Sequence, residues 1–338
     1  MNTRTHQRMV LASRPRGAPV APEHFRLERV PVPPVADGQV LVRNHFLSLD
    51  PYMRGRMEEF KSYAAPQPLN ETMVGGTVGI VEESRNSKFA AGDVVAGYLG
   101  WQEYGLSDGE GLMKIDTRHV PMSAYLGPVG MPGVTAWYGL KQICKPQPGE
   151  TVLVSAASGA VGSVVGQLAK MAGCRAVGIA GGPEKCAYVR EELGFDACID
   201  HRQFTDVRAM GEAIGAAAPD GVDAVFENVG GIGLDAALTR MNPFGRIALC
   251  GLIAGYEGGD VAIRNTRILL TMRLRIEGFI VSEHLEFWPT ALAELGQGVA
   301  TGTIKYRETV AEGLAAAPEA FIGMLRGRNF GKQLVKLV

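Results

Sequence analysis

From about residue 150 onward, short apolar runs rich in β-branched residues alternate with segments whose apolar residues recur at helical spacing. Such alternation predicts a parallel sheet covered by helices on both faces, and about six strands make it a doubly wound α/β fold. The predicted strands are 151–155, 175–180, 196–199, 222–227, 246–251 and 273–281, and the predicted helices between them are 159–172, 183–193, 205–217 and 233–241.

The first 125 residues or so follow a different pattern, in which short strand-like runs are separated by Gly and Pro turn signals. This pattern predicts a separate β-rich domain of antiparallel strands that close on themselves. The tail repeats strand, helix and strand, and we expect it to return to the β-rich domain, because the parallel sheet already has its complement of strands. The runs are 40–49, 74–83 and 93–99, followed in the tail by 305–310, 318–326 and 333–338.

Length and charge limit the possible functions. A chain of 338 residues is too long for one ordinary core and predicts two domains. Its 34 Lys and Arg against 35 Asp and Glu leave a formal charge of −1, so no global field recruits nucleic acid or an anionic membrane. No apolar stretch approaches the ~20 residues that span a bilayer, and the N-terminus lacks a signal peptide's apolar segment, so we expect a cytoplasmic protein.

The cysteines and histidines predict no metal site. Neither a disulfide framework nor a C-x-x-C zinc knuckle can be drawn from the cysteines, and the histidines lack partners at metal-ligand spacing. Cys144 and Cys250 could each be a reactive thiol, but a small buried apolar side chain is the simpler interpretation for every cysteine. The five cysteines are Cys144, Cys174, Cys186, Cys198 and Cys250.

A glycine-containing turn follows the first predicted strand of the sheet. Dinucleotide-binding folds place G-x-G-x-x-G between a strand and a helix, where backbone amides approach a pyrophosphate. Here Ala157 stands in the first glycine position, while Gly159 and Gly162 keep the other two. The interpretation is a pyrophosphate site, with an ordinary tight connection whose small residues only allow packing as the alternative.

Several motifs, in order along the chain, resemble those of one family. They are LSLDPYMRGRM at 47–57, GMPGVTAWYGL at 130–140, AASGAVGS at 156–163, FENVGG at 226–231, FGRIALCG at 244–251 and GRNFGKQLVKL at 327–337. Together they resemble the zinc-independent medium-chain dehydrogenases/reductases, in the branch that holds prostaglandin reductase and the alkenal and curcumin reductases. The similarity spans nearly the whole chain from about residue 40.

The resemblance implies a GroES-like β-rich catalytic domain over 1–128 and 304–338, and a Rossmann domain over 129–303 that binds NADPH. It implies a homodimer that reduces the carbon–carbon double bond next to the carbonyl of an enone or enal, with Tyr256 stabilising the enolate. The implied cofactor contacts are Ala157, Gly159, Ala160, Val161, Gly162, Lys185, His201, Arg202, Asn228, Cys250, Phe279, Ile280, Val281 and Asn329, and the implied substrate pocket includes Tyr52, Met131 and Thr135.

The residues after the second predicted strand agree with a preference for NADPH. An acid about 20 residues after the glycine turn would bind the ribose 2′-hydroxyl and select NAD. This strand instead ends in Gly181-Gly182-Pro183-Glu184-Lys185. Pro183 suits a first helical turn, so Lys185 is expected near a helix N-terminus where a 2′-phosphate could sit.

One position departs from the family pattern, since the family's tyrosine after the third strand is replaced by His201, followed by Arg202. His201 could hydrogen-bond and Arg202 could pair with the 2′-phosphate, but either could equally face solvent from a loop. Three functions fit the sequence as a whole: an NADPH-dependent enone reductase, a quinone reductase of the same superfamily, and a protein that binds NADPH without turnover. The sequence does not predict which substrate the enzyme would take.

Overall fold

The computed structural model describes residues 4–338 and divides into two compact units. The first, called here the β-rich unit, holds the chain up to Leu126 together with Glu308–Asn329 and Gln333–Val338. The second, called the parallel-sheet unit, holds Gly127–Arg307 and Phe330–Lys332. The chain therefore leaves the β-rich unit after Leu126 and returns to it at Glu308, and only the short segment Phe330–Lys332 of the tail belongs to the parallel-sheet unit.

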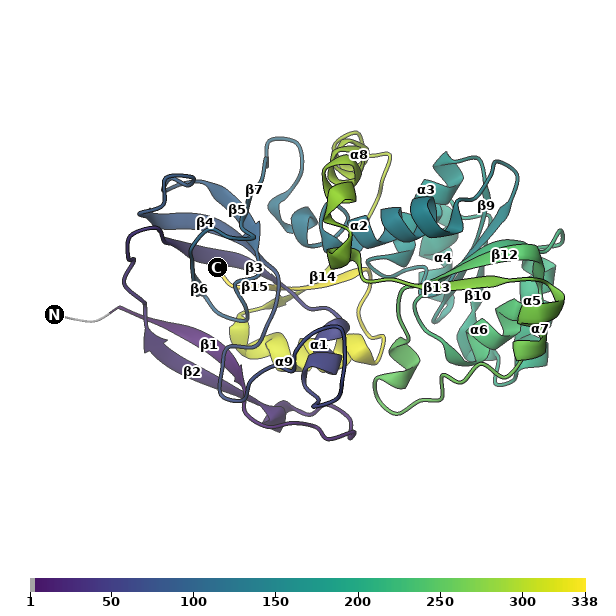
Figure 1. Cartoon of the computed structure of the whole chain (residues 1–338), viewed down its shortest axis with the longest axis horizontal. Coiled ribbons are helices and arrows are strands. Elements are labelled where there is room, and N and C mark those ends of the chain that lie inside the picture. Colours follow the sequence, from purple (N-terminus) through teal and green to yellow (C-terminus); the bar gives the residue numbers. More distant parts are fainter. Residues whose placement is uncertain (1–3) are drawn as a thin grey trace. The chain divides into compact units, whose positions relative to one another are not determined.

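The parallel-sheet unit contains six parallel strands (Figure 1). Their order is β10-β9-β8-β11-β12-β13, so the chain winds outward from β8 in one direction and then from β11 in the other. This is the doubly wound order of dinucleotide-binding folds, with its switch point between β8 and β11. The strands are β8 (Thr151–Val154), β9 (Arg175–Ala180), β10 (Ala197–Asp200), β11 (Val222–Glu227), β12 (Met241–Leu249) and β13 (Arg275–Gly278).

Helices cover both faces of this sheet because successive strand residues point to opposite sides. Val152 and Val154 of β8 join one buried cluster, while Leu153 between them joins the other. Fully burying a valine or leucine contributes about 1.5–3 kcal/mol, so each strand stabilises two cores. One face packs against α2 (Met131–Tyr138), α3 (Gly162–Met171), α4 (Pro183–Glu191) and α8 (Trp288–Ala300), and the other against α5 (Val207–Ala217), α6 (Gly231–Leu238) and α7 (Thr266–Thr271).

The predicted order of strands and helices is confirmed, but some predicted bounds are wrong. The sixth strand ends at Gly278, so Phe279, Ile280 and Val281 follow β13 instead of lying in it. Val281 begins a short 3-10 turn, and its carbonyl accepts the indole N–H of Trp288 at 3.1 Å. Among the other elements of this unit, the largest shifts are those of the predicted strand 246–251, now β12, the predicted helix 233–241, now α6, and the predicted helix 159–172, now α3.

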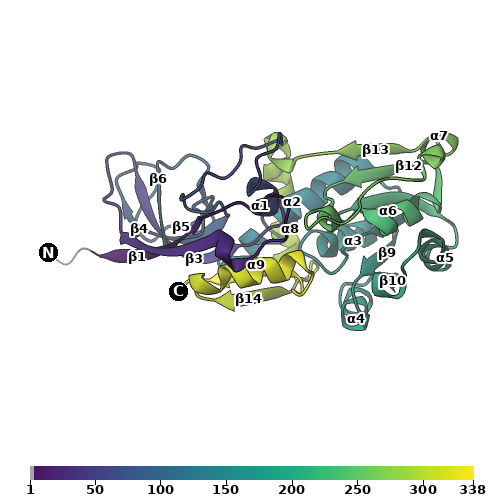
Figure 2. The same cartoon turned by 90° about the horizontal axis from the view of Figure 1, so that it is seen from below.

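The β-rich unit is built from antiparallel strands. The sheet order is β14-β15-β3-β4-β5-β7, with β6 also paired to β3, and β1 and β2 form a separate pair. The tail strand β15 pairs with β3 through Leu334 and Ser48, and Figure 2 shows α9 running beside β14. The strands are β1 (Thr5–Leu11), β2 (Phe25–Pro31), β3 (Val40–Ser48), β4 (Thr77–Ser84), β5 (Val94–Gly97), β6 (Tyr104–Ser107), β7 (Met113–Lys114), β14 (Glu308–Glu312) and β15 (Lys332–Lys336), with helices α1 (Tyr52–Arg56) and α9 (Ala317–Leu325).

Candidate active site

The two glycines of the turn after β8 differ in how much room they leave for a side chain. A Cβ added to Gly162 would lie 2.4 Å from the carbonyl oxygen of Ala156, so this glycine is required where α3 meets the turn. A Cβ added to Gly159 would meet only Ala156, at 3.1 Å from its oxygen and 4.0 Å from its Cβ. Gly159 therefore has more room for a side chain than Gly162, although the contact with the Ala156 oxygen is tight.

The first turn of α3 is suited to bind an anion. Val161 precedes the helix without a side-chain cap, and residues 159–161 are only partly buried while their neighbours are buried. The first amides of a helix have no partner within the helix, and its N-terminus carries partial positive charge. An ionised phosphate is the kind of ligand that satisfies such amides.

Three basic side chains gather at the ends of β9 and β10. A Cβ added to Gly181 would lie 2.9 Å from Nε2 of His201 and 3.2 Å from Nε of Arg202, so both side chains lie over this backbone. Lys185 is the third residue of α4, and its pKa is lowered by burial and further by the charge of Arg202, while Glu184 raises it. His201 and Arg202 are exposed, so a ligand can reach them.

Asp200 orients this group of basic residues, which the sequence analysis did not foresee. Its Oδ1 accepts hydrogen bonds from the amide of Gly182 at 2.8 Å and from the amide of Arg202 at 3.1 Å. The carboxylate thereby ties the end of β10 to the loop after β9. The cluster fits an anionic 2′-phosphate, because Lys185 and Arg202 lie close enough for the charge of Arg202 to lower the pKa of Lys185, and a bound anion would offset that repulsion.

At the switch point, Asn228 is fixed to the neighbouring strand. Its side-chain Nδ2 donates to the carbonyl oxygen of Ser155 at 2.8 Å, and its backbone N–H donates to Oγ of Ser155 at 2.7 Å. Ser155 and the buried Glu227 beside it were not predicted as site residues. The available signal was a polar residue at the end of each of two buried strands, directly after β8 for Ser155 and as the last residue of β11 for Glu227.

The segment that carries Tyr256 is bound to the loop after β11. Backbone amides of Ile253 and Ala254 donate to the carbonyls of Asn228 and Val229 at 3.2 and 3.1 Å. Tyr256 ends the short 3-10 turn Ile253–Gly255, its own amide donates to Ile253 at 3.1 Å, and it is partly exposed. The structure therefore brings Asn228, Cys250 and the Tyr256 backbone together at the carboxyl ends of β11 and β12.

The residues after β13 contribute mainly to packing through their side chains. The ring of Phe279 lies 5.4 Å from that of Tyr138 and 6.3 Å from that of Phe226, measured between centroids. In α2, the hydroxyl of Thr135 donates to the carbonyl of Met131 at 2.7 Å, so it is committed to its own helix. Because these side chains are engaged in packing or in a hydrogen bond within their helix, a ligand would contact mainly the backbone groups at these positions.

Tyr52 and Asn329 belong to the β-rich unit. Tyr52 begins α1, and its hydroxyl oxygen is buried without a hydrogen-bond partner among residues 4–338. Burial raises the pKa of Tyr52 well above its usual value, and the charge of Asp50 raises it further. A buried phenol of this kind stays protonated and needs a hydrogen-bond partner.

Three of the five cysteines, Cys144, Cys174 and Cys186, are buried as the sequence analysis favoured, whereas Cys198 and Cys250 are partly buried. Burial raises the pKa of both Cys144 and Cys250 to about 12, so neither forms a thiolate readily near neutral pH. Within residues 4–338, no group of three or more His, Cys, Asp or Glu is arranged to hold a metal ion. Over the same residues, no helix is both long and apolar enough to cross a bilayer.

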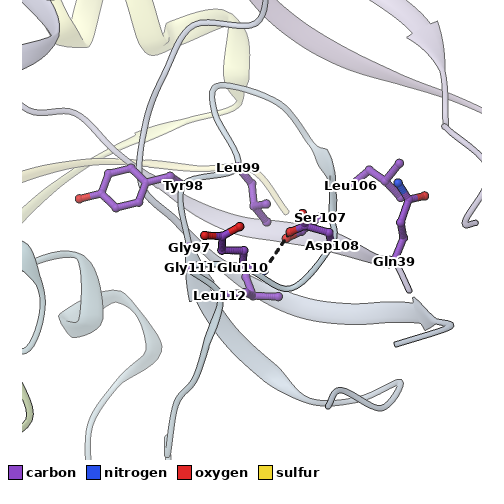
Figure 3. Close-up of a pocket in the computed structure, with 10 residues that line it drawn as sticks. All are labelled: Gln39, Gly97, Tyr98, Leu99, Leu106, Ser107, Asp108, Glu110, Gly111 and Leu112. Carbon is purple, nitrogen blue, oxygen red and sulfur yellow. Dashed lines mark hydrogen bonds between the residues drawn. The ribbon is translucent and has the colours of Figure 1, made fainter. Parts of the chain in front are cut away.

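A shallow hollow in the β-rich unit holds none of the predicted site residues. It is formed around residues 97–99 and 106–112, with Gln39 at its side (Figure 3). Within it, the amide of Glu110 donates to Oδ1 of Asp108 at 2.9 Å.

Two family models match the chain. A model described as the N-terminal domain of oxidoreductase covers residues 7–115, and one described as zinc-binding dehydrogenase covers residues 160–297. Together they span most of both units. The name of the second model refers to zinc, although the described residues hold no metal-binding group.

Curated relatives and a solved structure resemble the chain over nearly its whole length. It is 45% identical to the NADPH-dependent curcumin reductase of Escherichia coli, over 98% of this chain and 97% of that protein. It is 43% identical both to rat prostaglandin reductase 1 (93% and 94% covered) and to tobacco NADP-dependent 2-alkenal reductase (89% and 88% covered). CurA from Vibrio vulnificus, solved in complex with NADPH, superposes with a TM-score of 0.91 at 46% identity, covering 98% of this chain and 99% of that one.

Proposed function

Because this chain belongs to the medium-chain dehydrogenases/reductases, in the branch of the curcumin, prostaglandin and 2-alkenal reductases, we propose that it reduces the carbon–carbon double bond of α,β-unsaturated ketones and aldehydes with NADPH. The observation that carries this proposal is that a cofactor site and a candidate donor lie on the same sheet. The glycine turn without a side-chain cap and the basic cluster suit NADPH, and the Tyr256 segment lies beside the switch point, where ligands bind.

The cofactor's phosphates are assigned to the glycine turn and the basic cluster. The amides around Gly159 to Gly162 would hold the pyrophosphate, with Ala157, Ala160 and Val161 shaping the turn. Lys185 and Arg202 would pair with the 2′-phosphate, and His201 would donate a hydrogen bond to it. Backbone groups of Asn228, Cys250, Phe279, Ile280, Val281 and Asn329 are assigned to the nicotinamide half.

The chemistry needs one well-placed donor. When bound, NADPH supplies a hydride to the β-carbon of the substrate, which leaves an enolate that must be stabilised before its α-carbon is protonated. We assign the role of hydrogen-bond donor to the enolate oxygen to the hydroxyl of Tyr256. Tyr52, Met131 and Thr135 are assigned to the substrate pocket, and the domains to 1–128 with 304–338 for the substrate and 129–303 for the cofactor.

An assay with matched substrates tests this proposal. Purified protein is mixed with NADPH and, separately, with an aliphatic enone, a 2-alkenal and a simple quinone, while the absorbance of NADPH is followed. We expect rapid oxidation with the enone and the alkenal. Oxidation with the quinone alone would establish the quinone reductase instead. Tight NADPH binding with no turnover of any substrate would indicate a non-catalytic NADPH-binding protein.

Lys185→Ala is expected to weaken NADPH binding by about 10- to 100-fold while NADH binding stays nearly level, because one charge-assisted contact contributes roughly 1.5–3 kcal/mol. Titration calorimetry with both cofactors measures this difference, and Arg202→Ala should show a smaller effect of the same kind. Lys170→Ala is the matched control, because Lys170 of α3 is a lysine of the same unit whose Nζ already pairs with Oδ1 of Asp196 at 2.9 Å. Equal weakening of both cofactors by Lys185→Ala would make Lys185 a structural residue.

We also propose that the protein is a cytoplasmic homodimer. β13 lies at the edge of the parallel sheet, where a second copy of the strand could pair with it. The exposed side chains of Phe244 (66%) and Leu270 (78%) lie on neighbouring elements of the same unit and offer apolar surface for this contact. All five cysteines are free, as the reducing cytoplasm would keep them. Light scattering on the purified protein tests the dimer.

A further inference from the structure

Glu227 is a buried carboxyl group at the end of β11 to which the proposed chemistry gives no role. It is 2% exposed. Its Oε1 accepts three hydrogen bonds, from Oγ of Ser155 at 2.9 Å and from the amides of Val229 and Gly230 at 2.6 and 2.7 Å. Burial raises the pKa of this carboxyl group, while the surrounding donors lower it.

The Glu227 side chain fixes the geometry of Asn228. Oγ of Ser155 donates to Glu227, and the same Oγ accepts the amide of Asn228 at 2.7 Å. The Asn228 side chain donates to the Ser155 carbonyl at 2.8 Å. Because Ser155 follows β8 and Glu227 ends β11, these bonds join the two strands on either side of the switch point.

The backbone carbonyl of Glu227 binds the end of a third strand, β12. Its carbonyl oxygen accepts the amides of Cys250 and Gly251 at 2.9 and 3.1 Å, directly after β12. The following residues continue this pattern, since Ile253 and Ala254 bond to the carbonyls of Asn228 and Val229. One residue thus joins the loop that carries Asn228 to the turn that carries Tyr256.

We propose that Glu227 is a positioning residue, whose side chain holds the Asn228 loop and, through it, the Tyr256 turn in the geometry that hydride transfer to an enone requires. This inference rests on the proposed function. It assigns Glu227 no contact with substrate or cofactor. Its effect is expected on kcat and on the nicotinamide half of the cofactor site, but not on the adenosine half, which the Lys185 cluster holds.

The main variant is Glu227→Gln, which keeps the shape of the side chain and replaces one carboxyl oxygen with an amide group that cannot accept a hydrogen bond. The matched control is Asp223→Asn, at the opposite end of the same strand. Oδ2 of Asp223 accepts the amide of Thr151 at 2.8 Å, so it joins β11 to β8 at their amino ends as Glu227 does at their carboxyl ends. Ser155→Ala is a second variant that removes the same network without changing Glu227.

We expect Glu227→Gln to lower kcat for an enone by about 10-fold, because small misplacements of reacting groups are costly. The dissociation constant of 2′,5′-ADP, a fragment with the adenosine half alone, should change by less than about twofold. Ser155→Ala should behave in the same way, and the double variant should be no worse than the poorer single one, because both remove one network. Asp223→Asn should keep kcat at the wild-type value.

A readout independent of turnover separates this inference from the proposed function. By hydrogen exchange, the amides of residues 228–230 and 250–256 should exchange at least about 10-fold faster in Glu227→Gln, while those of α3 stay unchanged. Unchanged exchange there, or an equal kcat loss in Asp223→Asn, would overturn the role of Glu227. If Glu227→Gln shows the expected faster exchange but the wild-type protein reduces no enone, the proposed function alone is overturned.

Discussion

Tyr256→Phe is expected to slow enone reduction by about 10²–10³-fold in kcat, with NADPH affinity unchanged. The reason is that the tyrosine hydroxyl is the donor assigned to the enolate oxygen, and loss of one preorganised donor to an oxyanion typically costs this much. A phenol donates a hydrogen bond without carrying charge, which suits an oxygen that becomes negative only during the reaction. Steady-state kinetics with an enone and NADPH, together with NADPH titration, measure both quantities.

Two further variants distinguish catalysis from packing at Tyr256. Tyr188→Phe serves as the matched control in the same unit, because the Tyr188 hydroxyl is buried without a hydrogen-bond partner among the described residues. Its removal should leave kcat within about twofold. If Tyr256→Phe loses less than a few-fold while Tyr256→Ala raises KM for the enone, Tyr256 lines the pocket and does not act as the donor.

Local pattern predicted the strands whose ends carry strong signals. The bounds of β9 and β11 agree with the prediction to the residue, since turn-forming residues flank both: Gly173 and Gly181 border the first, and Gly221 precedes the second. The glycine turn predicted the sequence of β8, turn and α3 for the same reason. At the end of β13 the signal misled, because Phe279, Ile280 and Val281 continue a strand-like composition into a turn.

Contacts between distant segments could not be predicted from the sequence. Ser155 and Glu227 are 72 residues apart, and no periodicity links them, yet their side chains meet because β8 and β11 are neighbours at the switch point. The same holds for Asp200, whose bond to Gly182 depends on the pairing of β9 with β10. Residue types that contact a ligand are visible in motifs, whereas the residues that position them become visible only once the sheet order is known.

Gly159→Val is expected to weaken NADPH binding by at least about 100-fold while the protein stays folded. A branched side chain would occupy the place where backbone approaches the pyrophosphate, and two charge-assisted hydrogen bonds of about 1.5 kcal/mol each would be lost. The fold should tolerate the change with a small shift of the turn, because a Cβ at this position meets only Ala156, with its oxygen at 3.1 Å. NADPH titration and a thermal melt of the same sample measure the two effects.

Gly162→Ala provides the opposite control in the same turn. Its Cβ would lie 2.4 Å from the Ala156 oxygen and 3.0 Å from the Cα of Ala157, closer than backbone atoms permit. We therefore expect this smaller substitution to lower the melting temperature more than Gly159→Val does, although it adds only one carbon. A folded Gly159→Val protein with wild-type NADPH affinity would show that the turn packs α3 against β8 and holds no pyrophosphate. If both variants lose stability equally, Gly159 has no more room for a side chain than Gly162, and both glycines serve to pack the turn.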